Sequence, residues 1–403
     1  MSSESSPSLS LPGLPGDATA VVVTQGATEY LSRTLAGLAA QSRPPARVLV
    51  VDVSRDGGAA LPDGAPESWG LLATPGARTF GAAVSEALAQ DVSDGGSEAG
   101  RTRTSTRWLW LLHDDSAPEP TTLAALLRAV EHSPSVGVAG PKQRTWGEPV
   151  RLLEAGVTTS RFGRRMTGVD EGEVDQGQLD GRDDVLGVGT AGMLVRADVW
   201  EQLGGTDPAL GPYLDGLDLS RRARLAGHRV VVVPNAVVRH ARASFAGLRD
   251  GDGEPDHRSS FGARRQALLH TQLAWVPLPL VPVVVVLALA SGVLRALWRV
   301  ITKEPVLAVA DVTAPLWVLA RPGRIAAARR NARRTRALPR RSLRLLQATW
   351  RDVYREYRDR RMRRRESQRV VRAPSELELR ELAAITRRRR WALGGLALVL
   401  GAA

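Results

Sequence analysis

The chain has 403 residues, enough for one large domain with accessory segments, and its 43% apolar content supports a buried core. It contains no cysteine, which excludes disulfides and cysteine-ligated zinc. The net charge of +13 is uneven, because residues 1–260 carry 25 basic and 33 acidic side chains, whereas residues 261–403 carry 30 and 9. The basic character therefore belongs to the C-terminal third, which could contact an anionic membrane surface or nucleic acid.

Residues 1–17 are rich in Ser, Pro and Gly and lack the basic and apolar regions of a secretory signal, so we expect a flexible leader. From Ala18, short apolar runs alternate with helical stretches, which predicts an α/β domain with a largely parallel sheet. The expected strands are 18–24, 47–53, 69–74, 108–112 and 136–140. The expected helices are 28–41, 80–90 and 120–131, with a surface insertion at 91–107 and a long loop region at 144–184 that could cover a site.

Polar clusters follow three of these strands: Thr24 with the next two residues, residues 52–58, and His113 with Asp114 and Asp115. One acid at a strand end is more often a helix cap or a turn residue. Three clusters at strand ends of one domain favour a single ligand crevice, because ligands of parallel sheets bind at the carboxyl ends of the strands.

These motifs resemble those of the family 2 glycosyltransferases, which have a GT-A fold, over roughly residues 18–244. The family's V-D-x-x-S-x-D-G strand end, which holds the base and ribose of a nucleotide, is VDVSRDGG here. The resemblance places Asp52 at the base-binding position and leaves Asp56 as a turn former or a ribose contact. The family's N-x-G segment is matched by Thr79–Ala83, where only Gly81 carries over.

The HDD stretch resembles the family's D-x-D element, with His113 in place of the first acid. The resemblance makes Asp115 a metal ligand, Asp114 a ribose contact or a supporting residue, and His240 the histidine that completes the metal site. Mn²⁺ or Mg²⁺ would let carboxylates and a donor diphosphate share one site. The alternatives are that Asp115 caps the following helix and that His240 is structural.

The stretch Tyr213–Arg222 resembles the family's E-D-x-D-L-x-x-R element, whose acids include the base of inverting enzymes. Asp215 and Asp218 match the first and last acids, and Gly216 replaces the middle one. We expect Asp215 to be the base and Asp218 to anchor the helix N-terminus. Their spacing of three places both on one helical face, so the roles could be exchanged. Residues 187–196 resemble the small-residue segment that lines the family's sugar pocket.

The C-terminal third contains apolar segments beside a basic one. Leu273–Leu294 has 22 residues without a charge and is long enough to cross a bilayer, although three prolines crowd its first half. The alternative is a buried helix of a soluble protein. We expect membrane-embedded or interfacial helices at 261–320, an arginine-rich cytoplasmic segment at 321–390 and the start of a transmembrane helix at 391–403.

The sequence thus predicts a membrane-associated, inverting, metal-dependent glycosyltransferase of a bacterial type, with its catalytic domain (residues 18–260) on the cytoplasmic face. It would move a sugar from a nucleotide-sugar donor to a lipid-linked cell-envelope glycan. The alternative is a catalytically inactive GT-A module that scaffolds a membrane complex, which His113 and Gly216 favour slightly. Nucleic acid is a weaker partner, because the basic segment has few stacking aromatics and lies between apolar stretches.

Overall fold

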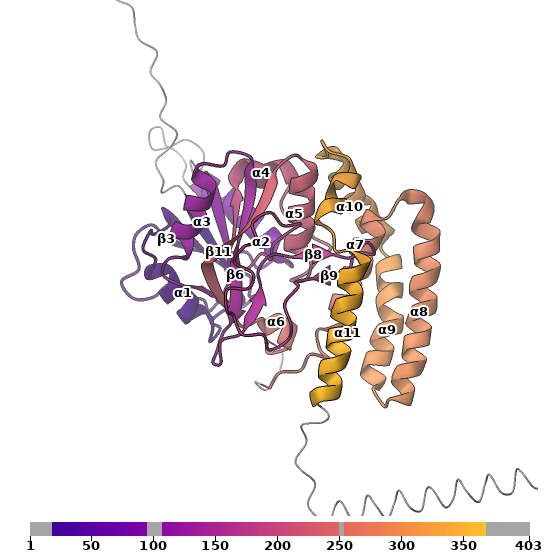
Figure 1. Ribbon diagram of the computed structural model, residues 1–403. Helices are drawn as coiled ribbons and strands as arrows, with labels where there is room; N and C mark the ends of the chain where they lie inside the picture. Colours follow the sequence, from indigo (N-terminus) through magenta and orange to yellow (C-terminus); the bar gives the residue numbers. More distant parts are fainter. Residues whose placement is uncertain (1–17, 95–106, 250–253, 368–403) are drawn as a thin grey trace, which may run out of the picture. The chain divides into compact units, whose positions relative to one another are not determined.

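The computed structural model describes residues 18–94, 107–249 and 254–367 (Figure 1). The expected leader, most of the 91–107 insertion and the expected transmembrane start at 391–403 lie outside these ranges. The chain divides into two compact units at Thr349/Trp350. In the second unit, the described part is the helix α11 (Trp350–Ser367).

A mixed sheet forms the centre of the first unit, and β10 lies antiparallel between β4 and β6. The predicted α/β fold is confirmed, although the sheet is less parallel than expected. Its strands are β1 (Ala18–Thr24), β2 (Arg47–Asp52), β3 (Trp69–Ala73), β4 (Trp108–His113), β5 (Ser116–Pro118), β6 (Val136–Thr145), β7 (Leu152–Glu154), β10 (Met193–Arg196) and β11 (Arg229–His240). They are ordered β3-β2-β1-β4-β10-β6-β11-β5, with β7 paired to β6. Residues of the expected 144–184 loop also form the hairpin of β8 (Thr158–Thr159) and β9 (Arg165–Met166).

Helices cover both faces of the sheet, because successive residues of each strand point to opposite sides. On β1, Val21 packs in the core under α2 (Phe80–Asp94), α4 (Ala197–Leu203) and α5 (Asp215–Leu225). Its neighbour Val22 packs in the core under α1 (Leu31–Ala39) and α3 (Thr122–Glu131).

The strand registers bring the polar strand ends to one edge. Thr24 pairs with Asp52, and Val23 pairs with His113. The short strand β5 then pairs antiparallel with the end of β11, in the register that sets Ser116 opposite His240. A histidine distant in sequence therefore lies beside the HDD stretch.

The apolar segment is divided by its prolines. The helix α7 (Phe261–Trp275) ends before Pro277, and a 3₁₀ turn (Leu278–Leu280) leads into α8 (Val281–Ile301), whose Pro282 is tolerated in the first turn. The helices α8 and α9 (Pro305–Leu319) lie side by side as a hairpin in Figure 1. The helices α6 (Ala243–Ala246) and α10 (Pro322–Arg334) and a 3₁₀ segment (Arg340–Leu346) complete the first unit.

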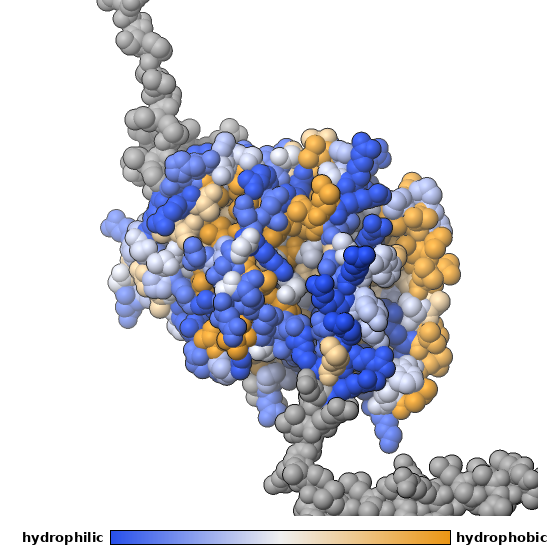
Figure 2. All heavy atoms as spheres, in the orientation of Figure 1, coloured by the Kyte–Doolittle hydropathy of each residue, from blue (hydrophilic) through white to orange (hydrophobic). Residues whose placement is uncertain are grey.

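One described stretch, the 24 residues Leu278–Ile301, is long and apolar enough to cross a membrane. A second would exist only if α9 and α10, bent by 65°, formed one broken span. Large apolar side chains of α8 such as Leu294 and Ile301 are exposed, and the apolar colour along this helix is plain in Figure 2. An exposed apolar surface of this kind suggests association with a membrane.

Candidate active site

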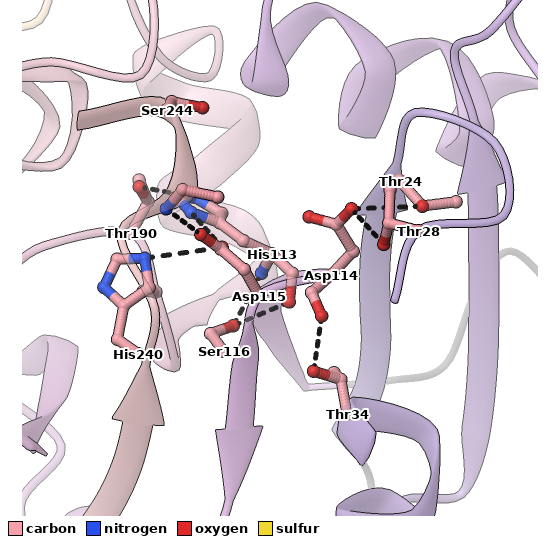
Figure 3. A network of polar contacts seen from close by, with 12 residues as sticks. Thr24, Thr28, Thr34, His113, Asp114, Asp115, Ser116, Thr190, His240 and Ser244 are labelled. Carbon is pink, nitrogen blue, oxygen red and sulfur yellow. Dashed lines mark hydrogen bonds and ion pairs between the residues drawn. The ribbon is translucent and has the colours of Figure 1, made fainter. Parts of the chain in front are cut away.

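Asp115, His113 and His240 converge at the end of β4 (Figure 3). Asp115 Oδ1 lies 3.4 Å from His240 Nε2 and 3.9 Å from His113 Nδ1. One potential ligand atom from each residue lies within 4.8 Å of the other two. The sequence analysis placed Asp115 and His240 together but gave His113 no role, although His113 occupies the first position of the acidic motif.

The backbone of the following segment fixes Asp115 and leaves one carboxylate oxygen free. Asp115 Oδ2 accepts a 2.7 Å hydrogen bond from the N–H of Ala243, which follows Arg242 in a left-handed backbone conformation. Asp115 Oδ1 is buried and, within the described chain, has no hydrogen-bond partner. Burial alone would raise the pKa of Asp115, but His240, His113 and Arg249 together hold this pKa well below its usual value. Asp115 Oδ1 is therefore ionised and available to a cation.

Other residues orient the two imidazole rings. His240 Nδ1 lies 3.1 Å from Gln143 Oε1, so Nε2 faces Asp115. His113 Nε2 lies 3.0 Å from the Thr190 hydroxyl, and the tautomer that donates there leaves the Nδ1 lone pair facing Asp115. Burial lowers the pKa of His113 to about 4. A buried carboxylate oxygen and a neutral imidazole are donors that suit Mn²⁺ or a similar divalent cation, so these three residues fit a metal.

Asp114 faces away from this group. Arg249 pairs with both of its oxygens, and Asp114 Oδ2 also accepts hydrogen bonds from the Thr28 hydroxyl at 2.8 Å and the Thr24 hydroxyl at 3.3 Å (Figure 3). Thr24, a predicted ligand contact, thus donates to Asp114. The sequence analysis missed Arg249, because no pattern ties a residue beyond β11 to the acid at the end of β4.

Asp215, the predicted base, is buried at the start of α5. The Thr190 hydroxyl lies 3.4 Å from each of its oxygens, and the Gly216 N–H donates to Asp215 Oδ1 at 2.7 Å. Burial raises the pKa of Asp215 to about 6 even though these hydrogen bonds act in the opposite direction. The preceding residue, Leu214, has a left-handed backbone with φ of 67°, a strained conformation that recurs at active sites.

Asp218, the other predicted catalytic acid, does not line the same cavity. Its Oδ2 accepts a hydrogen bond from Arg222 Nε at 2.8 Å, and its Oδ1 accepts one from Trp275 Nε1 at 3.0 Å. Asp218 therefore ties α5 to the end of α7.

Asp52 and Gly81, both predicted nucleotide contacts, are held by close neighbours. The Asp52 carboxylate accepts hydrogen bonds from the N–H groups of Gly26, Ser54 and Ala59. Burial would raise the pKa of Asp52, but these N–H groups lower it below its usual value. A Cβ atom at Gly81 would lie 1.8 Å from Thr206 Oγ1, so this glycine lets α2 contact the turn after α4.

Gly216, where the family motif has an acid, allows α5 to approach the Val188–Thr190 backbone. A Cβ atom there would lie 2.6 Å from Val188 O and 2.7 Å from Thr190 N. The glycine therefore lets Thr190 lie close to Asp215. Gly216 and His113, the two positions that differ from the family motifs, thus both contribute to the site.

A cavity of about 270 Å³ is lined by His113, Asp115, Asp215 and His240, whereas the other predicted site residues, Thr24, Asp52, Gly81, Asp114 and Asp218, do not line it. Glu154 also lines the cavity, and it was not predicted from the sequence because it lies inside the expected 144–184 loop. Its carboxylate accepts a hydrogen bond from Gly189 N at 2.8 Å and pairs with Arg165. The ionisable or hydrogen-bonding side chains of the lining include His113, Asp115, Gln143, Glu154, Thr190, Asp215, His240 and Arg242.

An α/β sheet with a buried acid and a candidate metal group around one cavity at its strand ends is typical of an enzyme active site. The family description "Glycosyltransferase like family 2" matches residues 15–251, more than half of the chain, and the chain belongs to this family. The predicted family and enzyme class are confirmed: the protein is a glycosyltransferase.

Two relatives are glycosyltransferases by name. N-acetylglucosaminyl-diphospho-decaprenol L-rhamnosyltransferase of Mycobacterium tuberculosis is 27% identical over 251 residues, which is 56% of this chain and 76% of the relative. Galactofuranosyltransferase GlfT1 of Mycolicibacterium smegmatis is 29% identical over 218 residues, or 52% of this chain and 65% of the relative. Among solved structures, a mannosyltransferase from Pyrobaculum calidifontis with GDP-Man and Mn²⁺ is similar with a TM-score of 0.39 and 16% identity, covering 81% of this chain and 78% of that one.

Proposed function

We propose that this protein is an inverting glycosyltransferase that moves a sugar from a nucleotide-sugar donor to a lipid-linked cell-envelope glycan. One observation carries the proposal: the buried Asp215 carboxylate and the Asp115 group line the same cavity. The name of the Mycobacterium tuberculosis relative, which contains a diphospho-decaprenol compound, supports a lipid-linked acceptor.

Asp215 acts as the general base. With a pKa of about 6 it is ionised at neutral pH and can accept a proton from an acceptor hydroxyl. The acceptor oxygen then forms a bond to the anomeric carbon, and the bond from this carbon to the diphosphate oxygen breaks on the opposite side. Thr190, placed between Asp215 and His113, orients both.

His113, Asp115 and His240 would hold a divalent cation, which offsets the charge that builds on the departing diphosphate. Asp52 and Gly81 support the nucleotide-binding edge by fixing the loop after β2 and the start of α2, respectively. Asp218 positions α5 rather than touching the substrate. Asp114, Arg249 and Thr24 support the segment that carries Asp115.

We also propose that the catalytic domain faces the cytoplasm, with α8 and α9 in the membrane or at its surface. The basic segment after them would lie against anionic headgroups. The exposed apolar surface of α8 supports this placement.

Transfer and hydrolysis of UDP-, GDP- and dTDP-sugars by the full chain in membranes with Mn²⁺ test the proposal. We expect turnover of at least one donor by the wild type, none by Asp215→Asn, and retained turnover by the positioning variant Asp218→Asn if it folds. A wild type that neither binds nor turns over any donor would contradict the proposal.

A further inference from the structure

A second cavity, of about 650 Å³, adjoins the catalytic one. Both cavities are lined by Leu268 of α7, and the consecutive residues Arg264 and Arg265 line the first and the second, respectively. The second cavity lies among α5, the turn of the β8–β9 hairpin, α7, α8 and the 3₁₀ segment Arg340–Leu346.

The second cavity is electropositive. Its described lining contains no Asp or Glu and five arginines: Arg161, Arg221, Arg265, Arg295 and Arg340. Two of them are partly neutralised, because Arg265 Nε and Arg295 Nε lie 3.4 and 3.0 Å from Asp311 Oδ1, a buried acid of α9. The remaining three leave a positive wall on the side of α5.

Among the five arginines, Arg221 gives the strongest indication of an anion-binding site. It is buried, and within the described chain its Nε and Nη1 have no hydrogen-bond partner. Its guanidinium stacks 4.0 Å from the centre of the Trp275 ring, and that of Arg340 lies 5.6 Å from the same ring. The nearby Asp218 already accepts hydrogen bonds from Arg222 and Trp275.

Arg221 therefore keeps two donors that no group of the described chain uses. Burial lowers the pKa of Arg221 to about 10, so the group remains cationic at neutral pH. A buried cation with unused donors destabilises the fold unless an anion binds it. Phosphate oxygens are the groups that arginine donors bind best.

The opposite wall is apolar. Val283, Val284, Leu287 and Ala288 of α8 line the cavity. Beyond the cavity the same helix carries further exposed apolar side chains, among them Val293, Leu294 and Leu297, beside which a hydrocarbon chain can lie. A ligand that fits both walls combines an anionic group with a long apolar chain.

We propose that this second cavity binds the diphosphate and the first isoprenoid units of a polyprenyl-diphosphate-linked acceptor. Arg221 and Arg340 bind the diphosphate, α8 receives the chain, and the attached sugar extends past Leu268 toward Asp215. The inference rests on the proposed glycosyl transfer, for which it names the acceptor class.

Binding of geranylgeranyl diphosphate to the full chain in phosphatidylcholine nanodiscs tests the proposal. We expect binding to weaken about tenfold or more in Arg221→Ala and in Arg340→Ala, because each removes a charged donor. Arg340 is only half-buried, so its variant remains informative if Arg221→Ala does not fold. Arg341→Ala removes an exposed arginine that does not line the cavity and should bind like the wild type.

Three results would overturn the proposal. The first is unchanged binding in both cavity variants. The second is equally tight binding of inorganic diphosphate, which would indicate a free-anion site. The third is displacement of the probe by phosphatidylglycerol in the nanodisc, which would indicate a site for bulk headgroups. Donor hydrolysis in the same preparation separates the two hypotheses, because a wild type that hydrolyses a donor but does not bind geranylgeranyl diphosphate rejects only the acceptor site.

Discussion

Asp215 and Asp218 lie three residues apart at the start of α5, yet their carboxylates have different surroundings. Asp215 contacts Thr190 and lines the catalytic cavity, whereas Asp218 accepts hydrogen bonds from Arg222 and Trp275. The three-residue spacing in the sequence is compatible with either Asp215 or Asp218 as the base. The difference comes from the partners that α7 and the Val188–Thr190 backbone bring to the helix, and it is the basis for proposing Asp215 as the base and Asp218 as a positioning residue.

The rate of transfer should depend on the ionisation of Asp215. Because burial raises the pKa of this acid to about 6, the base is protonated and inactive below that pH and ionised above it. We expect kcat/KM for the acceptor to rise with pH through about 6 and then level off. Asp218→Asn should keep this inflection, and an unchanged inflection in any residual activity of Asp215→Asn would assign it to another group.

The same burial should make Asp215 a source of instability. Its folded pKa lies above the unfolded value of 3.8, so ionisation at higher pH favours the unfolded chain. Asp215→Asn should raise the free energy of unfolding by up to about 3 kcal/mol near pH 8 and change it little below about pH 4. Urea unfolding at the two pH values measures this, and an equal effect at both would show that charge is not the cause.

His113 should contribute to metal affinity. His113→Ala removes a neutral imidazole that faces the free oxygen of Asp115, so we expect Mn²⁺ affinity to fall at least about tenfold. Electron paramagnetic resonance of free Mn²⁺ during a titration measures it. His228→Ala is the control, because His228 lies in a turn away from the cavity and bonds to Gln202. Equal affinity in both variants would leave His113 as a packing residue.

The sequence predicted the fold well where the pattern is local. Strand β1 matches its expected range, and β2, β3 and β4 each differ from theirs by one residue, because buried runs of Val, Leu and Trp with polar ends leave little freedom. The antiparallel insertion of β10 was not predictable, since its place between β4 and β6 depends on pairing across the chain. Similarly, the prolines indicated a break but not the two separate helices α7 and α8.

The sequence indicated candidate site residues that belong to recognisable motifs. It did not indicate the residues from other segments that contact them. Asp115, His240 and Asp215 were predicted from the resemblance to the family's motifs and do line one cavity. Arg249 and Glu154 belong to segments with no periodicity, so only the folded chain shows their contacts with Asp114 and Gly189. Gly216 looked like a lost acid, whereas the structure shows a position with no room for one.

Gly216→Ala should therefore destabilise the protein. The added Cβ would meet two backbone atoms, at 2.6 and 2.7 Å, which cannot move without shifting the Val188–Thr190 segment. We expect a loss of about 1–3 kcal/mol of unfolding free energy and a lower kcat, because Thr190 would no longer orient Asp215. Gly323→Ala in α10 is the matched control: no neighbour lies within 4 Å of its Cβ position, so it should be neutral or slightly stabilising.

Arg249 should be required for stability, because it compensates a buried acid. Arg249→Met leaves Asp114 with only the hydroxyl donors of Thr24 and Thr28, and we expect a loss of about 3–5 kcal/mol in unfolding free energy. The double variant with Asp114→Asn should recover most of this loss, since no uncompensated charge remains. Urea unfolding of the single and double variants measures the coupling.

The half-exposed pair of Arg43 and Glu131 is the control for this cycle. Its nitrogen and oxygen lie 2.7 Å apart, but the side chains are 22% and 31% exposed, so Arg43→Met should cost less than about 1 kcal/mol. If Arg249→Met costs no more than this control, Asp114 is solvated in the free enzyme. In that case Arg249 does not hold the HDD stretch in place, and the N–H groups of Ala241 and Ala243 position Asp115 without it.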